Sequence, residues 1–339
     1  MSDPYAIVEA AFGTGAEVVT CTRLPGGASR ETWSLDVVTG TGDRHDLILR
    51  LDSPGLPAAP GPAATTTAPA ADGAAAGVGL WLGLGLAAEA RLMRAAAEAG
   101  VPVPEIVACG PSYILMTRVA GETIPRKILR DDAFAAARPL LARQCGQALA
   151  AIHRMPLSVA PPGGPPGGPE DPLVRWRAVL DQLGEPHPVF ELALRRLAAD
   201  RPPARPPAVV HGDFRNGNLI VGPEGIRAVL DWELAHAGDP LEDLGWLCVK
   251  AWRFGSPLPV GGFGGYDELI RAYEEAGGRP VDRESLRWWE TFGVLKWGVI
   301  CVMQTMRHLR GGTRSVELAA IGRRVCETEW DLLGLLREK

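Results

Sequence analysis

The residues most informative about chemistry lie between positions 209 and 221, where two apolar stretches flank the polar loop HGDFRNGN. An acid, Asp213, and an amide, Asn218, stand five residues apart in this loop, and a second acid, Asp231, follows thirteen residues after Asn218. Phosphoryl transfer requires few covalent partners, but the metal-bound phosphates and the nucleophile must be held in line. The spacing therefore favours a phosphoryl-transfer site over a structural polar loop between strands.

Each residue of this group has a chemical role that its type predicts. We expect Asp213 to accept the proton of an acceptor hydroxyl group. Mg²⁺ prefers carboxylates, carbonyls and water as ligands, so we predict that Asn218 and Asp231 bind it. Arg215 stands two residues beyond the proposed base and within reach of the transferred phosphate, whose developing charge it would offset. Losing one such electrostatic donor typically lowers the rate by roughly 10²- to 10³-fold.

This segment resembles the aminoglycoside phosphotransferase family. The string HGDFRNGNLIV, followed by AVLDWELAHAGDPLEDLGWLCVKAW, is most similar to the branch related to kinase-like domains fused to acyl-CoA dehydrogenases. The resemblance extends over about residues 24–336 and is closest over residues 209–252. It implies an α+β, two-lobed protein-kinase-like fold with a small β-rich N-lobe and a larger helical C-lobe. It also implies ATP and Mg²⁺ as cofactors.

The resemblance implies a phosphate-binding side of the site. A Gly-rich turn containing Gly26, Gly27 and Ser29 would cover the ATP phosphates with backbone N–H groups, although the string is equally typical of an ordinary turn. Arg50 fills the third-strand position that usually holds a lysine, and Glu89 is its expected ion-pair partner. Arginine has a planar fork of donors in place of a point charge, so a nucleotide-binding protein without catalysis stays open.

The segment 113–121 resembles the hinge between the two lobes of this family. Backbone groups of Thr117 and Val119 would meet the adenine edge, and Met116 would line the pocket as an adaptable apolar wall. A buried strand followed by a turn describes these residues equally well, so only their position in the chain favours the hinge.

Hydrophobic periodicity and turn residues predict the elements that must position this site. Strands are expected at 31–38, 47–51, 103–108, 113–117, 209–210, 219–221 and 227–230. The first two are joined by turn residues 39–43 and should form a hairpin. Helices are expected at 86–99, 140–152, 267–276, 283–309 and 315–336. We interpret residues 1–117 as the N-lobe, with an Ala/Pro/Gly-rich insert at about 53–79, and residues 118–339 as the C-lobe. A second low-complexity loop spans about 161–172.

Several conspicuous polar residues favour structural roles. His153 closes an amphipathic helix and is expected to be hydrogen-bonded within the protein, and His211 is expected to shape the catalytic loop through backbone contacts. Asp239 and Asp243 are typical of a helix start, and the resemblance implies that their segment supports the active site. Glu233 lies two residues past Asp231, where a metal or substrate contact and a structural role are both open. The tryptophans of the second half are mostly expected in the core.

Composition limits the partners and the setting. A hydrophobic content of 46 % can build a sizeable core, and a net charge of −5 with a pI near 5.8 offers no basic field for nucleic acid or anionic lipid. The six cysteines form no C-x-x-C pair, and the first residues lack the pattern of a signal peptide. The longest uncharged apolar stretch, 73–88, is shorter than a membrane span. We expect a cytoplasmic protein that acts on a small molecule; no oligomeric state is indicated.

The acceptor is the least determined part of the sequence. The branch resemblance suggests a hydroxyacyl thioester or another small hydroxylated metabolite, with Arg253 as a candidate anion contact. An aminoglycoside or macrolide antibiotic is the alternative acceptor. Aminoglycosides are polycations, which favour a pocket rich in carboxylates, and the acids between 267 and 275 are interleaved with basic residues. A protein-kinase activity is disfavoured because no APE-like anchor follows Asp231. A nucleotide-binding regulator without catalysis is the alternative of another class.

Overall fold

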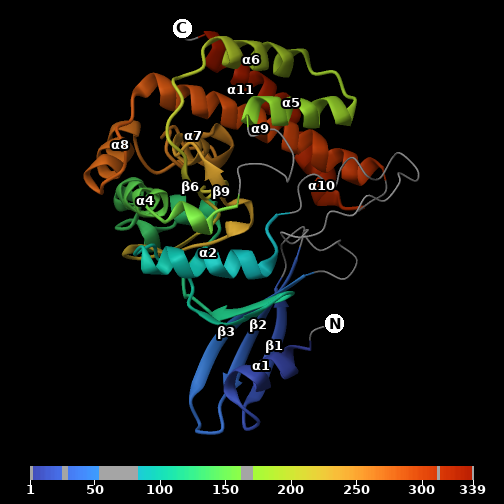
Figure 1. The fold of residues 1–339 in the computed structure, drawn as a ribbon, viewed down its shortest axis with the longest axis vertical. Coiled ribbons are helices and arrows are strands. Elements are labelled where there is room, and N and C mark those ends of the chain that lie inside the picture. The colour runs from blue at the N-terminus through green and yellow to red at the C-terminus, as the bar shows by residue number, and fades with distance from the viewer. Residues whose placement is uncertain (1–2, 25–29, 53–82, 162–170, 311–313, 338–339) are drawn as a thin grey trace.

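The structure is a computed structural model that describes residues 3–24, 30–52, 83–161, 171–310 and 314–337. A sheet forms one end of the molecule and a larger mass of helices forms the other, with helix α2 between them (Figure 1). The insert at 53–79 and most of the loop at 161–172 lie outside the described residues. The α+β architecture with a β-rich first part and a helical second part is confirmed.

The sheet has five antiparallel strands in the order β1-β2-β3-β5-β4. The strands are β1 Glu17–Leu24, β2 Arg30–Val38, β3 Arg44–Asp52, β4 Ile106–Gly110 and β5 Tyr113–Thr117. Strands β2 and β3 form the predicted hairpin, whose turn is closed by Thr39 donating its backbone N–H to Asp43 at 2.9 Å. Strand β1 was not predicted from the sequence.

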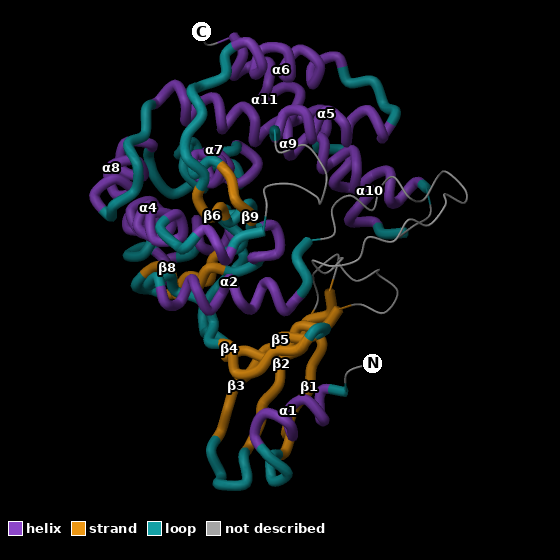
Figure 2. Tube along the Cα trace, viewed as in Figure 1, coloured by secondary structure: helices purple, strands orange, loops and turns teal. Residues whose placement is uncertain are grey.

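The two faces of the sheet are covered by different helices, as the two-residue period of strands requires. Leu115 of β5 packs with Ile7 and Val8 of helix α1 (Pro4–Phe12), whereas Ile114 and Met116 face the core that contains α2 (Leu86–Glu98). Figure 2 shows α2 lying between the sheet and the helical part. Helix α1 was not predicted, although its sequence carries clear end signals. Asp3 caps its first turn, Pro4 opens it and Gly13 follows its last residue.

The helical part contains the following helices, in chain order: α3 Pro125–Arg130, α4 Arg138–His153, α5 Pro172–Leu183, α6 Pro188–Ala199, α7 Leu241–Cys248, α8 Tyr266–Glu275, α9 Arg283–Leu309, α10 Val316–Gly322 and α11 Val325–Arg337. Short 3₁₀ turns lie at Asp132–Phe134, Leu157–Val159, Trp232–Leu234 and Lys250–Arg253. Helices α5 and α6 were not predicted. Among these helices, none is long and apolar enough to cross a membrane.

The prediction of one helix over residues 315–336 was wrong. The chain forms α10 and α11 instead, with a break at Arg323 and Arg324, whose N–H groups bond to carbonyls three residues earlier. The last residue of α10 is Gly322, where an added Cβ would lie 1.9 Å from the Thr305 hydroxyl oxygen on α9. Glycine is a poor helix former, and the close contact requires it here, so the helix ends at this point.

Helix α9 is the centre of the helical part, and α5, α6, α7, α10 and α11 all pack on it. Its approach to α7 is close, since a Cβ added to Gly245 would lie 2.5 Å from the backbone carbon of Trp289. This crossing holds α7 in one position beside the short ribbon β6–β9, whose His236 contacts Glu242 of α7. A second short ribbon is formed by β7 and β8. The ribbon strands are β6 Ala208–Val210, β7 Leu219–Gly222, β8 Gly225–Val229 and β9 His236–Gly238.

All six cysteines are free thiols. Cys145, Cys248 and Cys301 are buried, and burial raises the pKa of each of these thiols. These three thiols therefore stay protonated and unreactive in the folded chain.

Candidate active site

Strands β6 and β7 hold the loop of residues 211–218 from both ends. Phe214 is fully buried inside the loop, and the side-chain amide of Asn216 donates to the carbonyl of Gly261 at 2.7 Å. Gly212 has φ +80°, and a Cβ there would lie 2.4 Å from the carbonyl oxygen of Leu234. Only glycine fits this backbone conformation and this contact, which explains the residue between the histidine and the aspartate.

Three side chains converge on the carboxylate of Asp213. Trp246 Nε1 donates to Oδ1 at 2.8 Å, Arg215 Nε donates to Oδ1 at 3.0 Å, and Asn218 Nδ2 donates to Oδ2 at 2.6 Å. The structure thus brings the predicted base, the predicted phosphate contact and one predicted metal ligand together. Arg215 also lies over the ring of Trp252, with its guanidinium carbon 4.7 Å from the ring centroid.

Asp243, in the first turn of α7, holds the beginning of this loop through hydrogen bonds. Its carboxylate accepts the backbone N–H groups of His211 at 2.8 Å and Gly212 at 2.9 Å, and it contacts Nε2 of His153 at 3.1 Å. Burial raises the pKa of Asp243, but its contacts with His153 and His211 outweigh burial, and the net pKa is lowered. His153 also contacts the Tyr273 hydroxyl at 2.9 Å. The structural interpretations of His153, His211 and Asp243 agree with these contacts.

Asp231 follows strand β8 and lies beside Asn218, because the N–H of Leu230 donates to the carbonyl of Asn218 at 2.8 Å. Its backbone is left-handed, with φ +67°, a conformation that aspartate tolerates better than most residues. The amide nitrogen of Asn218 is engaged by Asp213, which directs its oxygen elsewhere. An amide oxygen and a carboxylate on adjacent segments suit Mg²⁺, which is held by one or two protein carboxylates plus water and phosphate.

The arginine in the lysine position pairs with the expected acid. Arg50 of β3 binds Glu89 of α2, and the Glu89 side chain is completely buried. Arg50 Nη2 also lies 3.6 Å from Asp231 Oδ1. Burial lowers the pKa of Arg50, but the charges of Glu89, Asp231 and Glu233 outweigh burial and raise it. The pair therefore connects the sheet, α2 and the predicted metal site through charged groups.

Arg30 is a member of this network that the sequence did not reveal. Its guanidinium binds the second oxygen of Glu89, contacts Asp52 at 3.4 Å and lies 3.5 Å from Glu233. Burial, together with the charge of Asp231, raises the pKa of Glu233 to about 7. The weak signal for Arg30 was its place at the start of a strand, directly after the Gly-rich turn.

Of the remaining residues predicted to bind the cofactor, the structure describes three and leaves three outside the described ranges. Met116 lies on the same face of the sheet as Arg50, since Ile48 pairs with Met116 and Arg50 pairs with Ile114. The N–H of Thr117 donates to Glu105 at 2.9 Å, and Val119 is half-buried in the segment after β5. The residues of the Gly-rich turn lie outside the described part of the chain: Gly26, Gly27 and Ser29.

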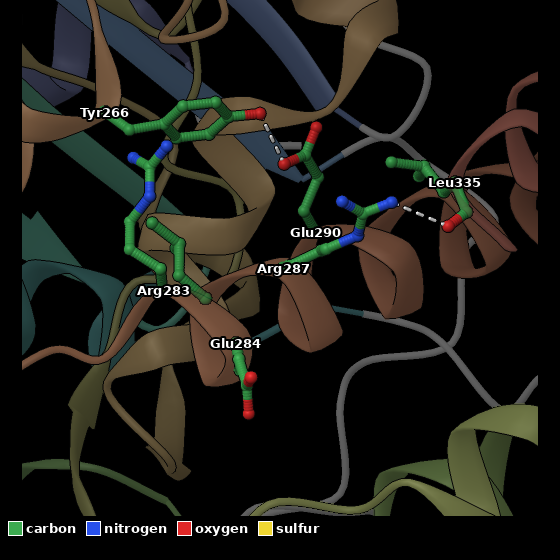
Figure 3. A pocket seen from close by; sticks show the side chains of 7 residues that line it. Tyr266, Arg283, Glu284, Arg287, Glu290 and Leu335 are labelled. Carbon is green, nitrogen blue, oxygen red and sulfur yellow. Dashed lines mark hydrogen bonds between the residues drawn. The ribbon is translucent and has the colours of Figure 1, made fainter. Parts of the chain in front are cut away.

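A pocket of about 320 Å³ between α8, α9 and α11 is lined by a different set of residues (Figure 3): Tyr266, Arg283, Glu284, Leu286, Arg287, Glu290 and Leu335. Its buried Glu290 accepts from the Tyr266 hydroxyl at 2.7 Å and binds Arg253 at 2.6 Å. The charge of Arg253 is therefore compensated inside the protein, which weakens its expected role as an anion contact. Within the described residues, no cluster of three or more His, Cys, Asp or Glu side chains could hold a metal ion.

Fold and site together define the class. A small sheet packed against helices α1 and α2, a larger helical part and the loop 211–218 between short strands make up the two-lobed protein-kinase-like fold. A putative aminoglycoside phosphotransferase from Ralstonia eutropha shares this fold with a TM-score of 0.68 and 20 % identity, covering 97 % of this chain and 95 % of the other. A macrolide 2′-phosphotransferase from Brachybacterium faecium shares the fold with a TM-score of 0.58 and 18 % identity, covering 95 % of this chain and 97 % of the other.

The family follows from the sequence match. Residues 20–289 match the model of the phosphotransferase enzyme family (APH), and the chain belongs to this family of enzymes that phosphorylate hydroxyl groups. It is 32 % identical over 184 residues to acyl-CoA dehydrogenase family member 10 of Mus musculus, covering 51 % of this chain and 17 % of that protein. It is 30 % identical over 175 residues to acyl-CoA dehydrogenase family member 11 of Gallus gallus, covering 47 % of this chain and 22 % of that protein. The matches thus span about a fifth of these curated relatives.

Proposed function

We propose that this chain transfers the γ-phosphate of ATP to a hydroxyl group of a small molecule. The observation that carries the proposal is the convergence of Trp246, Arg215 and Asn218 on the Asp213 carboxylate. These contacts hold one carboxylate oriented beside a cation and a metal-binding amide. Such an arrangement suits phosphoryl transfer, in which positioning and electrostatic stabilisation supply most of the catalysis.

In this proposal each residue acts through atoms whose positions support it. Asp213 orients the acceptor hydroxyl group and takes up its proton. Arg215 exchanges its contact with Asp213 for the transferred phosphate, and the neighbouring Trp252 ring keeps the guanidinium in place. Asn218 and Asp231 hold Mg²⁺, which, when bound, neutralises phosphate charge.

We propose that ATP lies between an N-lobe of residues 1–117 and a C-lobe of residues 118–339. Met116 would form an apolar wall, the carbonyl of Thr117 and the backbone of Val119 would meet adenine, and Arg50 would reach the phosphates. The Arg50 side chain, which is mostly buried but keeps some exposure, is held by Glu89, which supports this role. Gly26, Gly27 and Ser29 keep their expected place over the phosphates as a prediction.

For the acceptor, we propose a hydroxyacyl thioester or a related hydroxylated metabolite. The two curated relatives are acyl-CoA dehydrogenase family members, which supports this class by analogy. An aminoglycoside would favour carboxylates near the base, whereas the neighbours of Asp213 are an arginine, an amide and an indole. Two acids of α8 are engaged elsewhere, Asp267 with Arg283 and Glu274 with the N–H of Val281.

The experiment is a screen for acceptor-dependent ADP release. The purified chain receives ATP and Mg²⁺ with hydroxyacyl-CoA thioesters, sugars, aminoglycosides or macrolides, and mass spectrometry identifies any phosphorylated acceptor. We expect ADP release with a hydroxyacyl thioester and none from an Asp213→Ala variant. Phosphorylation of an antibiotic alone would overturn the acceptor class. A chain that binds ATP and phosphorylates none of these acceptors would favour the nucleotide-binding regulator.

A further inference from the structure

The indole of Trp246 is a donor to the reactive carboxylate that the catalytic-loop motif does not contain. It reaches Asp213 from α7, across 33 residues of sequence, with an N–O distance of 2.8 Å. The Trp246 side chain is 2 % exposed, so water does not compete for this hydrogen bond. An indole has a single N–H and no acceptor, which makes the contact one-directional.

The other two donors to Asp213 have second tasks in the proposed reaction. Arg215 would turn to the transferred phosphate, and Asn218 would share its side chain with the metal ion. Trp246 has no such task, because its only polar atom is occupied by Asp213. Its hydrogen bond can therefore persist through the reaction and keep the carboxylate oriented when Arg215 leaves.

Lys296 of α9 holds the Trp246 ring in place. Its ammonium nitrogen lies 4.6 Å from the ring centroid and donates to the carbonyl of Gly212 at 3.1 Å and to Glu242 at 3.0 Å. Lys296 is 3 % exposed, so its charge acts on the ring with little screening. A cation against an indole face is attracted to the ring, and here it also ties α9 to the catalytic loop.

We infer that Trp246 is a positioning residue for the Asp213 carboxylate and that Lys296 positions Trp246 in turn. The inference rests on the proposed phosphotransferase function. It assigns the orientation of the base to a residue of α7 and leaves Arg215 and Asn218 available for phosphate and metal.

The first test compares Trp246→Phe with Trp289→Phe. Both tryptophans are buried, but the Trp289 indole nitrogen has no hydrogen-bond partner within the described part of the chain. Trp289→Phe therefore controls for the loss of a buried indole without the loss of a hydrogen bond. We expect Trp246→Phe to lower kcat by about 10- to 100-fold, as expected for a lost hydrogen bond to a charged group, with KM for ATP within about 2-fold. Replacing Trp246 with 3-benzothienylalanine, which keeps the ring shape without the N–H, should lower kcat equally.

Two kinetic outcomes would overturn the inference. One is a kcat of Trp246→Phe within about 2-fold of the Trp289→Phe control. The other is normal turnover with the benzothienyl ring, since shape alone would then suffice. If the benzothienyl variant is slow and keeps wild-type thermal stability, loss of fold is excluded as the cause.

A second readout is independent of turnover. The chain has ten tryptophans, whose ¹⁵N-labelled indole groups give separate N–H signals, and Trp246→Phe identifies the one in question. We expect Asp213→Ala to move the Trp246 signal and to leave that of Trp289 in place. An unmoved Trp246 signal would contradict the contact. If the wild type phosphorylated no acceptor, the proposed function would fail, and this measurement would still decide whether Trp246 holds Asp213.

Discussion

Arg50 and Glu89 form an ion pair that joins strand β3 to helix α2, and the Glu89 side chain is completely buried. The second oxygen of the same carboxylate binds Arg30. Among the described residues, Glu89 is thus the only residue of α2 that forms ion pairs with both Arg30 and Arg50. Each arginine keeps further acidic contacts, Arg50 with Asp231 and Arg30 with Asp52 and Glu233.

This arrangement predicts unequal effects of removing its members. Glu89→Ala removes the buried carboxylate that Arg30 and Arg50 share and should lower the free energy of unfolding by about 3–5 kcal/mol. Arg50→Met leaves Glu89 paired with Arg30, so the loss of stability should be smaller. KM for ATP should rise at least about 10-fold, because the proposed contact of Arg50 with the phosphates is lost. Urea unfolding and ATP kinetics measure the two effects. Equal destabilisation by both variants would contradict the sharing of Glu89 by the two arginines. Arg50→Lys, which keeps the charge, is the control for KM.

The Lys296–Glu242 pair predicts how stability depends on pH. Burial raises the pKa of Glu242, but Lys296 and His236 outweigh burial, and the net pKa lies well below the ordinary 4.5. Below about pH 4.5 the unfolded chain takes up a proton that the folded chain does not, so the free energy of unfolding falls as the pH drops. Glu242→Gln should reduce this slope by up to about 1.4 kcal/mol per pH unit.

Urea titrations between about pH 3.5 and 6 measure that slope. The matched control is Glu224→Gln, because Glu224 is exposed and pairs with Arg227 on the surface, where ion pairs contribute little. An identical slope in wild type and Glu242→Gln would show that Glu242 is not held ionised by Lys296.

Thiol labelling tests the packing of the helical part. Cys326 is exposed and should react with a thiol reagent within the native chain. Burial raises the pKa of Cys301 to about 12 and places those of Cys145 and Cys248 well above their usual range, so these three should react only after unfolding. A Cys326→Ser variant should lose the fast phase alone. Rapid native labelling of Cys145, Cys248 or Cys301 would contradict the described packing.

Local sequence signals predicted the elements whose residues are close in the chain. The β2–β3 hairpin followed from two apolar runs around turn residues 39–43, and α9 followed from helical periodicity. The loop 211–218 was predicted because its flanking apolar runs and its acid and amide are all local. Helix α1 and strand β1 were missed, although the caps of α1 were readable from Asp3 and Gly13.

The contacts that complete the site could not be predicted in this way. Trp246 meets Asp213 across 33 residues, Arg30 meets Glu89 across 59, and Lys296 meets Gly212 across 84. No periodicity within a helix or strand encodes such pairs, because they depend on how α7 and α9 cross and how α2 lies against the sheet. The division of the sequence 315–336 into two helices likewise depends on the contact of Gly322 with α9.

The most direct test of the proposed phosphotransferase compares wild type with Asp213→Ala in the presence of ATP, Mg²⁺ and the acceptor found in the screen. Calorimetry measures ATP binding, and ADP release measures turnover in the same preparations. The proposed mechanism assigns Asp213 to the acceptor hydroxyl group and not to the nucleotide. It therefore predicts that Asp213→Ala binds ATP with a Kd within about 3-fold of wild type and that kcat falls by at least about 10³-fold. Turnover by Asp213→Ala at a rate close to that of wild type would contradict it.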